Sequence, residues 1–382
     1  KNLYIITYLI KVFFFGSEIK FIKSLSNESF KVNKEHINKN LFYGYKSLCK
    51  NNETFFDKIY SLENSTNITI DLNLNLIKRK FWSPKINIDN RLQEKTASNE
   101  VKRLLQKSLN LRMRSDVPIA FCLSGGIDSG LLVSLANKKF HKKVSTFSII
   151  DQDYRYNERK NINLILDDLK CDNLKIFLKK KKNLFFKRLK ELTNYHDGPI
   201  STISYYIHSF LSEEISKKGY KVAISGTGAD EIFTGYYDHY LLHLQSIYKH
   251  KSFKKNLENW YKFVLPFIRN PNLKDPYLYI NDKKNRDNVF ESKLGIKNFS
   301  RLIKRFNFTE KNYSNELLRN RMLNELFHEV VPIILKHDDL NSMFFSIENR
   351  SPYLDKDILE FSLKVPPEIL IKNGYQKNLL RS

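Results

Sequence analysis

The sequence predicts an α/β protein with a parallel central sheet, a mainly helical C-terminal part and a β-rich N-terminal part. Three observations indicate this fold class: strand-like runs that are apolar throughout, helix-like stretches between them, and glycine-rich turns directly after two of the runs. Strands buried on both faces are typical of a parallel sheet covered by helices. Such sheets bind their ligands at the carboxyl ends of the strands.

Residues 1–85 carry the β-type segments of the N-terminal part. We expect strands at Leu3–Leu9, Val12–Phe15 and Asn67–Lys78, the last because apolar and polar residues alternate along it. Pro84 ends this pattern, since proline cannot continue a strand ladder. The polar stretch that follows, residues 86–99, is expected to link this first domain to a second domain at residues 100–382.

From residue 100 onward, helical periodicity alternates with short apolar runs. Val101, Leu104, Leu105 and Leu109 mark the apolar face of a first helix. The elements expected after it are strands at Val117–Leu123, Val144–Ile150, Leu174–Leu178 and Lys221–Ser225, with helices at Gly130–Asn137 and Glu158–Leu169 among them. Residues 236–382 are expected to be mainly helical.

The composition excludes some classes of protein. The 382 residues include 65 Lys and Arg against 41 Asp and Glu, a formal net charge of +24, and 41% are hydrophobic, which excludes a wholly disordered chain. The basic residues are spread along the chain, which favours a solvated surface over a nucleic-acid partner. The densest run, Lys179–Lys182, is expected to open a helix or to fill a loop.

Cysteine usage and hydropathy bear on the location of the protein. Cys49, Cys122 and Cys171 are far apart and odd in number, so we expect no disulfide framework and no zinc site, and a cytoplasmic location. The apolar run Leu3–Phe15 is too short to span a bilayer, and Lys11 interrupts it, so no membrane partner is expected. The start at lysine instead of methionine indicates a fragment.

The first glycine-rich turn is Ser124-Gly125-Gly126-Ile127-Asp128-Ser129, between an expected strand and an expected helix. Consecutive glycines let the backbone turn sharply and present N–H groups, and the helix N-terminus adds a positive dipole, so the turn suits a phosphate. Ser124 and Ser129 add hydroxyl donors. Asp128 repels bare phosphate, so we expect it to act through Mg²⁺. The alternative is a plain β–α turn with a capping Asp.

The second turn is Ser225-Gly226-Thr227-Gly228-Ala229-Asp230-Glu231, which also follows an expected strand. A carboxylate there could face Asp128 across a nucleotide and complete a Mg²⁺ site. The alternative is again a glycine turn with a capping Asp. The first turn resembles the pyrophosphate-binding PP-loop of the ATP-pyrophosphatase superfamily, whose members cleave ATP between its α and β phosphates.

Six strings resemble, in the same order, those of the synthetase domain of glutamine-dependent asparagine synthetases. They are Leu123–Ser129 (LSGGIDS), Thr146–Ile149 (TFSI), Ser225–Tyr236 (SGTGADEIFTGY), Asp339–Met343 (DLNSM), Glu348–Asp355 (ENRSPYLD) and Lys377–Arg381 (KNLLR). The resemblance covers about residues 100–382 and implies an adenine-nucleotide alpha-hydrolase-like PP-loop domain. Residues 1–85 resemble the end of that family's glutaminase domain, which implies a truncated, mostly β remnant of an αββα fold.

The resemblance implies amidation of aspartate to asparagine at the expense of ATP. The β-carboxylate attacks the α-phosphorus, pyrophosphate leaves, and nitrogen from glutamine or ammonia displaces AMP from β-aspartyl-AMP. It further implies that Mg²⁺ is held by Asp128 and Asp230, and that Lys377 offsets charge on the phosphates. Asp230 and Thr227 join Lys377 as the residues expected to act in the reaction.

The nucleotide-binding residues are carried over from the same strings. The resemblance implies that Ser124, Gly125, Gly126, Asp128 and Ser129 hold pyrophosphate. It implies that Leu123, Ile149, Ser225 and Gly226 line the adenine and ribose site, with Tyr236 also on the nucleotide side. Arg350 and Asp355 are expected to form a structural ion pair.

Three departures from the family pattern matter. One is that Pro199–Ser209 contains no Arg, although some members place a phosphate-binding Arg near there. The other two leave alternatives open. Many members carry Glu where Thr227 stands, and because Thr cannot act as a carboxylate base, the acceptor or the proton route is expected to differ. None of the three cysteines is N-terminal, so either a glutaminase half precedes Lys1 or the protein uses free ammonia.

Other functions stay open beside aspartate amidation. One is amidation of another carboxylate, such as a sugar acid in surface polysaccharide synthesis. Another is a PP-loop protein that modifies tRNA, although no aromatic–basic module or zinc ribbon supports it. A third is a non-catalytic relative. The expected partners are small-molecule substrates, and the oligomeric state, including a homodimer, is left open.

Overall fold

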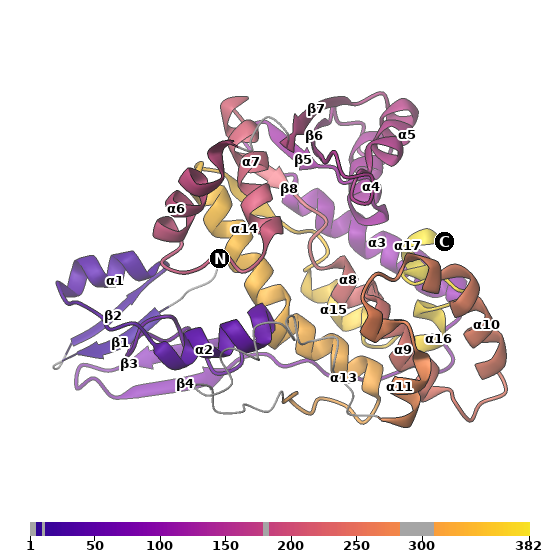
Figure 1. Cartoon of the computed structure of the whole chain (residues 1–382), viewed down its shortest axis with the longest axis horizontal. Helices are drawn as coiled ribbons and strands as arrows, with labels where there is room; N and C mark the ends of the chain where they lie inside the picture. Colours follow the sequence, from indigo (N-terminus) through magenta and orange to yellow (C-terminus); the bar gives the residue numbers. More distant parts are fainter. Residues whose placement is uncertain (1–4, 10–11, 179–182, 283–308) are drawn as a thin grey trace.

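The computed structural model describes residues 5–9, 12–178, 183–282 and 309–382. Its centre is a five-stranded parallel sheet in the order β7-β6-β5-β8-β9 (Figure 1). The strands are β5 (Ile119–Cys122), β6 (Ser145–Ile150), β7 (Asp172–Phe177), β8 (Val222–Ile224) and β9 (Glu348–Arg350). The predicted parallel sheet is confirmed.

The register places β5 at the middle of the sheet. Ala120 of β5 lies opposite Ser145 of β6 on one side and Ala223 of β8 on the other, all in parallel. The carboxyl ends of β5 and β8 therefore lie side by side at one edge of the sheet. The two glycine-rich turns follow these two strands.

Helices cover the sheet and fill the C-terminal part. On the sheet they are α3 (Glu94–Arg112), α4 (Ile127–Ser134), α5 (Arg159–Leu169), α6 (Phe185–Tyr195) and α7 (Ile203–Lys217). Further along the chain they are α8 (Ala229–Phe233), α9 (Tyr237–Ser246), α10 (Phe253–Phe263), α11 (Pro276–Asn281), α13 (Leu317–Asn324), α14 (Val331–Phe344), α15 (Lys356–Ser362), α16 (Pro367–Leu370) and α17 (Asn378–Arg381). Short 3-10 helices are η1 (Gly44–Ser47), η4 (Leu265–Phe267) and η5 (Pro271–Leu273), and short π-helices are η2 (Leu135–Lys139) and η7 (Glu325–Glu329).

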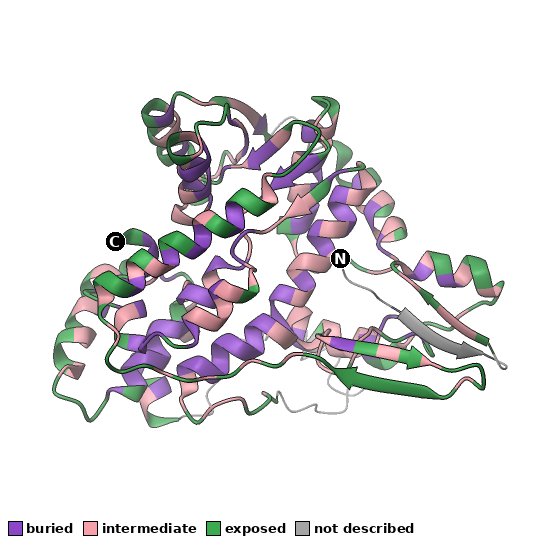
Figure 2. Ribbon diagram, turned by 180° about the vertical axis from the view of Figure 1, so that it is seen from behind, coloured by how far each residue is buried: buried purple, intermediate pink, exposed green. Residues whose placement is uncertain are grey.

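The main core lies among the sheet and the C-terminal helices, where Figure 2 shows most of the buried ribbon. It includes Leu105 of α3, Phe121 of β5, Ile224 of β8, Phe233 of α8 and Tyr353. The largest apolar cluster of the described residues thus packs directly beneath the two turns that follow β5 and β8. This packing gives the turns a rigid base.

The N-terminal part consists of two antiparallel hairpins and two helices. The hairpins pair β1 (Ile5–Leu9) with β2 (Val12–Gly16) and β3 (Thr66–Ile70) with β4 (Leu76–Lys80). The helices, which the sequence analysis did not expect, are α1 (Ile19–Ser26) and α2 (Lys34–Tyr43). Most of β3 and all of β4 is half-buried or exposed, in contrast to the main core (Figure 2).

The single strand predicted at Asn67–Lys78 is wrong, because the chain turns back between β3 and β4. The side chain of Asp71 accepts hydrogen bonds from the backbone N–H groups of Asn73 (2.9 Å) and Asn75 (2.8 Å). Leu74 adopts a left-handed backbone with φ +63°. An Asx turn of this kind competes with an extended strand.

The predicted linker over residues 86–99 is helical from Glu94, where α3 begins. Ala97 in the first turns of α3 is fully buried, so this end of the helix is held by the core. Residues 179–182, where a helix start or a loop was predicted, lie outside the described residues. So do residues 10–11 and residues 1–4, which include the first two residues of the predicted strand Leu3–Leu9.

Contacts join the N-terminal part to the rest of the molecule. Leu48 and Phe55 pack with Tyr205 of α7 and Ile333 of α14 in one small core. Lys50 also pairs with Glu329 at 3.0 Å. No helix within the described ranges is long and apolar enough to cross a membrane.

Candidate functional site

Three side chains from distant parts of the sequence meet at the carboxyl edge of the sheet. The Nζ atom of Lys377 lies 2.6 Å from Oδ2 of Asp128 and 2.5 Å from Oδ1 of Asp230. The three residues lie more than a hundred positions apart in the sequence, and the family strings that contain them predict that the three act together. The described structure thus brings the two acids to one cation, and we call this group the acid–lysine cluster.

The positions of the two acids follow from the sheet register. Asp128 lies in the first turn of α4, directly after β5, and Asp230 lies in the first turn of α8, directly after β8. The two turns touch: a Cβ atom added at Gly226 would lie 3.1 Å from the Cβ of Asp128. Because β5 and β8 are neighbours, the two carboxyl groups converge.

Lys377 reaches the acids from a strained backbone position at the start of α17. Its φ of +53° lies in the left-handed region, which costs a non-glycine residue about 1 kcal/mol or more. Burial disfavours its charge, but attraction to Asp230 and Asp128 outweighs burial and raises the pKa of Lys377 above its ordinary value. The ammonium group therefore stays charged at neutral pH.

The environment of Asp128 fits a bound cation. Burial raises the pKa of Asp128 above its ordinary value, and the nearby charge of Asp230 acts in the same direction against the attraction of Lys377. Oδ1 of Asp128 is buried and has no hydrogen-bond partner in the described structure. A buried carboxylate oxygen without a partner, beside a second carboxylate, matches the oxygen ligands that Mg²⁺ prefers.

The first glycine-rich turn is organised by its two serines. Gly125 adopts φ +80°, a conformation open to glycine, and this turns the chain from β5 into α4. Oγ of Ser129 accepts from the backbone N–H of Ser124 at 3.1 Å and lies 3.0 Å from Oγ of Ser124. Ser129 is buried, whereas Ser124 is exposed. Ser129 therefore shapes the loop, and Ser124 is the hydroxyl that can meet a ligand.

The second turn places Thr227 between two oxygen partners. Its hydroxyl lies 3.1 Å from Oγ of Ser225 and donates to Oδ2 of Asp338 of α14 at 3.4 Å. The sequence motifs predict a role in the site for Thr227 and Ser225 but not for Asp338. Asp338 lies next to the string DLNSM, which was read only as a family motif.

Three other residues predicted to bind the nucleotide, Leu123, Ile149 and Tyr236, lie outside the acid–lysine cluster. Leu123 is buried in the main core, 2% exposed, at the end of β5. Ile149 lies half-buried on β6, the neighbouring strand. The hydroxyl of Tyr236 donates to Oε1 of Glu231 at 2.6 Å.

Glu231 stabilises the second turn from within the core. It is 2% exposed, and burial followed by the charge of Asp230 raises the pKa of Glu231 to about 7. The hydrogen bond from Tyr236 acts against this shift. Glu231 therefore holds a proton over much of the pH range in which a free carboxyl group has lost it.

Two residues that support the acids were not predicted. A Cβ atom at Gly235 would lie 1.7 Å from Oδ1 of Asp230 and 2.4 Å from Cε of Lys377, so only glycine fits there. The hydroxyl of the fully buried Tyr353 donates to the backbone carbonyl of Asp128 at 3.0 Å. Both residues belong to the strings SGTGADEIFTGY and ENRSPYLD, so the motifs contained the signal.

The predicted ion pair between Arg350 and Asp355 is wrong. Arg350 donates to the backbone carbonyl groups of Arg112 (2.7 Å) and Arg114 (2.8 Å) and pairs with Glu348. Asp355 pairs instead with Arg112 at 2.9 Å and caps α15 by accepting from the N–H of Asp357. The end of α3 lies between the two residues in space, which their short separation in sequence does not reveal.

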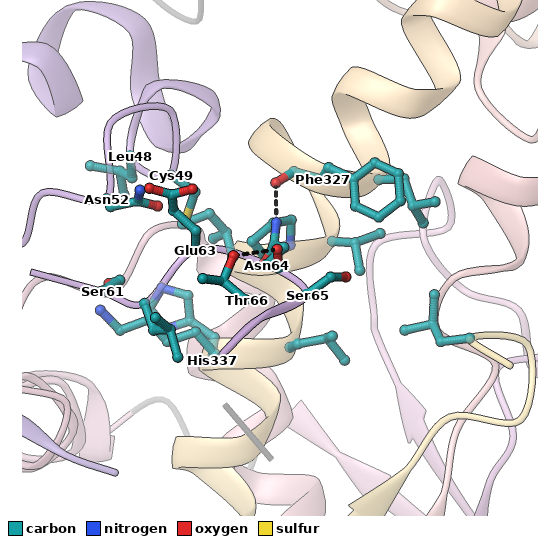
Figure 3. A pocket seen from close by; sticks show the side chains of 18 of the residues that line it. Leu48, Cys49, Asn52, Ser61, Glu63, Asn64, Ser65, Thr66, Phe327 and His337 are labelled. Atoms are coloured by element: carbon teal, nitrogen blue, oxygen red, sulfur yellow. Dashed lines mark hydrogen bonds between the residues drawn. The ribbon is translucent and has the colours of Figure 1, made fainter. Parts of the chain in front are cut away.

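A cavity of about 640 Å³ lies between the N-terminal part and α14 (Figure 3). Cys49, Thr66 and Phe327 line one part of it, and His337 lines another. His337 immediately precedes Asp338, the partner of Thr227. Leu354 also lines the cavity, and a Cβ atom added at Gly228 would lie 2.3 Å from its side chain, so the cavity ends beside the second turn.

The sequence is similar to a known protein family and to several known proteins. Residues 100–382 match the family described as asparagine synthase. The chain is 30% identical over 311 residues to asparagine synthetase [glutamine-hydrolyzing] 1 of Bacillus subtilis, covering 76% of this chain and 47% of that protein. A protein of Methanocaldococcus jannaschii that is named for the same activity is 28% identical over 230 residues, covering 59% of this chain and 43% of that protein.

A more distant relative carries a different name. The amidase chyE of Penicillium rubens is 25% identical over 181 residues, covering 42% of this chain and 26% of that protein. The chain spans about half the length, or less, of the curated relatives it matches. The family match, in contrast, covers the whole of the sheet, both turns and Lys377. The chain therefore belongs to the asparagine synthase family.

Proposed function

We propose that the protein converts aspartate to asparagine at the expense of ATP, with β-aspartyl-AMP as intermediate and AMP and pyrophosphate as products. The nitrogen comes from glutamine or from ammonia. One observation carries the proposal: a lysine and two acids from three family strings converge on the carboxyl edge of a parallel sheet. Family membership supports the same reaction type.

Each residue of the site has a role in this reaction. Ser124, Gly125, Gly126 and Ser129 form the loop that holds the departing pyrophosphate, with N–H groups and a hydroxyl as donors. Lys377 offsets the charge that develops on the phosphates. Leu123, Ile149, Ser225, Gly226 and Tyr236 are proposed for the adenine and ribose side.

Asp128 and Asp230 are proposed to hold Mg²⁺, because Oδ1 of Asp128 is a buried oxygen without a hydrogen-bond partner among the described residues. Bound there, the ion would supply charge neutralisation at the phosphates. Before nucleotide binds, Lys377 keeps the two carboxyl groups together. The protein atoms thus stay close to the arrangement that the substrate needs, which reduces the reorganisation cost of binding.

The division into domains bears on the nitrogen source, because a glutaminase-type domain supplies nitrogen from glutamine. We propose that residues 1–85 are the C-terminal part of such a domain, residues 86–99 a linker and residues 100–382 the ATP-binding domain. Two relatives are named for glutamine hydrolysis, and the family match begins at residue 100. We also propose a cytoplasmic location, which the three free cysteines support. Light scattering can test whether the protein forms a homodimer.

Pyrophosphate release tests the proposal. Incubation of the protein with ATP, Mg²⁺, aspartate and ammonium chloride should release pyrophosphate and AMP in equal amounts, and omission of aspartate or of Mg²⁺ should abolish the release. Asp128→Asn should lower the rate by about 100-fold or more, because it removes a charged metal ligand.

The exposed Asp168→Asn is the matched control, since Asp168 pairs with Lys138 on the surface and should leave the rate unchanged. An Asp128→Asn protein that releases pyrophosphate at the wild-type rate would contradict the proposed metal role. The same assay with a panel of carboxylates, including sugar acids, examines the second candidate, amidation of a different acceptor. Thr227 and the similarity to an amidase favour keeping that candidate.

A further inference from the structure

The second turn contacts a carboxylate that the acid–lysine cluster does not use. Asp338, on α14, accepts from the hydroxyl of Thr227 at 3.4 Å, and Thr227 also contacts Ser225. Thr227 follows Gly226, the residue whose added Cβ would touch Asp128. Thr227 is thus one residue from the contact with the first turn, and its hydroxyl reaches the carboxyl group of Asp338.

Asp338 is nearly buried, and it has one neighbour that reaches solvent. Its side chain is 11% exposed, and its Oδ1 lies 3.5 Å from Nδ1 of His208 of α7, whose side chain is 45% exposed. The charge of Asp338 also acts on two neutral groups, Tyr205 of α7 and Cys122 of β5. Burial, with a smaller contribution from Asp338, raises the pKa of Tyr205 and raises that of Cys122 to about 12, so both stay protonated.

The proposed reaction needs a group that accepts a proton from the attacking nitrogen. When ammonia attacks an acyl-adenylate, the new C–N bond leaves nitrogen with a proton that must be removed before the amide is complete. Asp128 and Asp230 are both paired with Lys377, and Lys377 is itself a cation. Asp338, in contrast, has only hydroxyl and imidazole groups as its contacts in the described structure.

Resting on the function proposed above, we propose that Asp338 accepts the proton of the attacking nitrogen through the hydroxyl of Thr227. The lone pair of ammonia forms the C–N bond, and the C–O bond breaks with its electron pair leaving on AMP. A proton of the nitrogen passes to the oxygen of Thr227 as the proton of Thr227 passes to Asp338. His208 then carries it to solvent. Asp338 is a positioning residue that acts through Thr227.

Two half-reactions separate this role from the proposed function. The first is aspartate-dependent exchange of labelled pyrophosphate into ATP, which reports adenylation alone. The second is asparagine formation from ammonium chloride, which includes the attack by nitrogen. Asp338→Asn should keep the exchange within about twofold and slow asparagine formation by about 100-fold or more, the usual contribution of a proton acceptor.

Variants of Thr227 give the matched comparison. Thr227→Val removes the hydroxyl at equal size and should slow asparagine formation like Asp338→Asn, whereas Thr227→Ser keeps the hydroxyl and should restore it. Asp338→Asn should also change the pH profile of asparagine formation. With hydroxylamine, a weaker base whose adduct loses its proton more readily, hydroxamate formation by Asp338→Asn should stay close to the wild-type rate.

The outcomes distinguish the two proposals. Wild-type protein without aspartate-dependent exchange would overturn the proposed function. With that exchange present, wild-type asparagine formation by Asp338→Asn at an unchanged pH profile would overturn the proton role. Equal loss of both half-reactions in Asp338→Asn would also overturn it, because it would indicate a structural contribution only.

Discussion

Two of the clusters in which acidic side chains pair with one cation differ in how far they are buried. In the acid–lysine cluster, Lys377 meets Asp128 and Asp230, whose side chains are 19% and 38% exposed. In the second, which we call the arginine cluster, the fully buried Arg321 pairs with Glu329 at 2.6 Å, Glu310 at 2.9 Å, Glu325 at 3.0 Å and Asp238 at 3.4 Å.

The arginine cluster is also supplied with further cations. His239 lies 2.6 Å from Glu325. Burial lowers the pKa of His239, but the carboxylates of Glu325 and Asp238 together raise it above its ordinary value. Lys50 of the N-terminal part pairs with Glu329. Asp238, His239 and Glu325 lie close enough to hold a metal ion, with ligand atoms within 4.8 Å of one another, but Arg321 already contacts two of the three.

The comparison shows that acids alone do not mark a ligand site. The arginine cluster is sealed among α9, α13 and η7, and its charges pair with one another. The acid–lysine cluster lies at the carboxyl edge of the sheet, keeps a carboxylate oxygen without a partner, and is partly open. We therefore infer that the arginine cluster stabilises the fold, and we propose the acid–lysine cluster for ligand binding.

The largest expected effect comes from removing the cation of each cluster. Arg321→Met should lower the free energy of unfolding by about 3–5 kcal/mol, because it leaves several carboxylates buried without their partner. Lys377→Met should lower it by about 1 kcal/mol, since water can reach Asp230. Urea unfolding followed by circular dichroism measures both. Equal losses in the two variants would remove the distinction between the clusters.

A smaller effect is expected from Glu231, which lies beside the acid–lysine cluster. Because the pKa of Glu231 is raised to about 7 in the folded protein, its contribution to stability is fully present below the pKa of the unfolded chain and is lost as pH rises through 7. Glu231→Gln should remove this loss and be more stable than wild type at pH 8 by about 1–3 kcal/mol.

Unfolding at two pH values checks the Glu231 prediction. At pH 5 the variant and the wild type should be similar, because the carboxyl group is then protonated in the folded protein and the Gln side chain can accept the same hydrogen bond from Tyr236. A stability difference that is the same at pH 5 and pH 8 would contradict a proton held on Glu231.

The sheet and the acid pair could be predicted because each of their signals is local. Apolar runs gave strands β5, β6, β7 and β8, and each glycine turn followed its strand. β9 was missed, since its three residues, Glu-Asn-Arg, show neither apolar character nor alternation. The hairpin of β3 and β4 was missed because Asp71 forms an Asx turn inside an alternating pattern.

The contacts between distant segments could not be derived from local pattern. Lys377 was assigned only through a family string, and nothing in its neighbourhood predicts that its ammonium group meets Asp128. The predicted pairing of Arg350 with Asp355 was wrong because both residues contact Arg112 of α3, which lies more than two hundred residues away in the sequence. The contact of Thr227 with Asp338 likewise depends on how α14 packs against the second turn.

The central claim is that Asp128 and Asp230 bind one magnesium–nucleotide together, and calorimetric titration with ATP tests it most directly. The wild-type protein should bind ATP at least about tenfold more tightly with Mg²⁺ than without it, a difference of about 1.4 kcal/mol. Asp128→Asn and Asp230→Asn should each lose this dependence while keeping their circular dichroism spectrum. Unchanged Mg²⁺-dependent binding in both variants would contradict the claim.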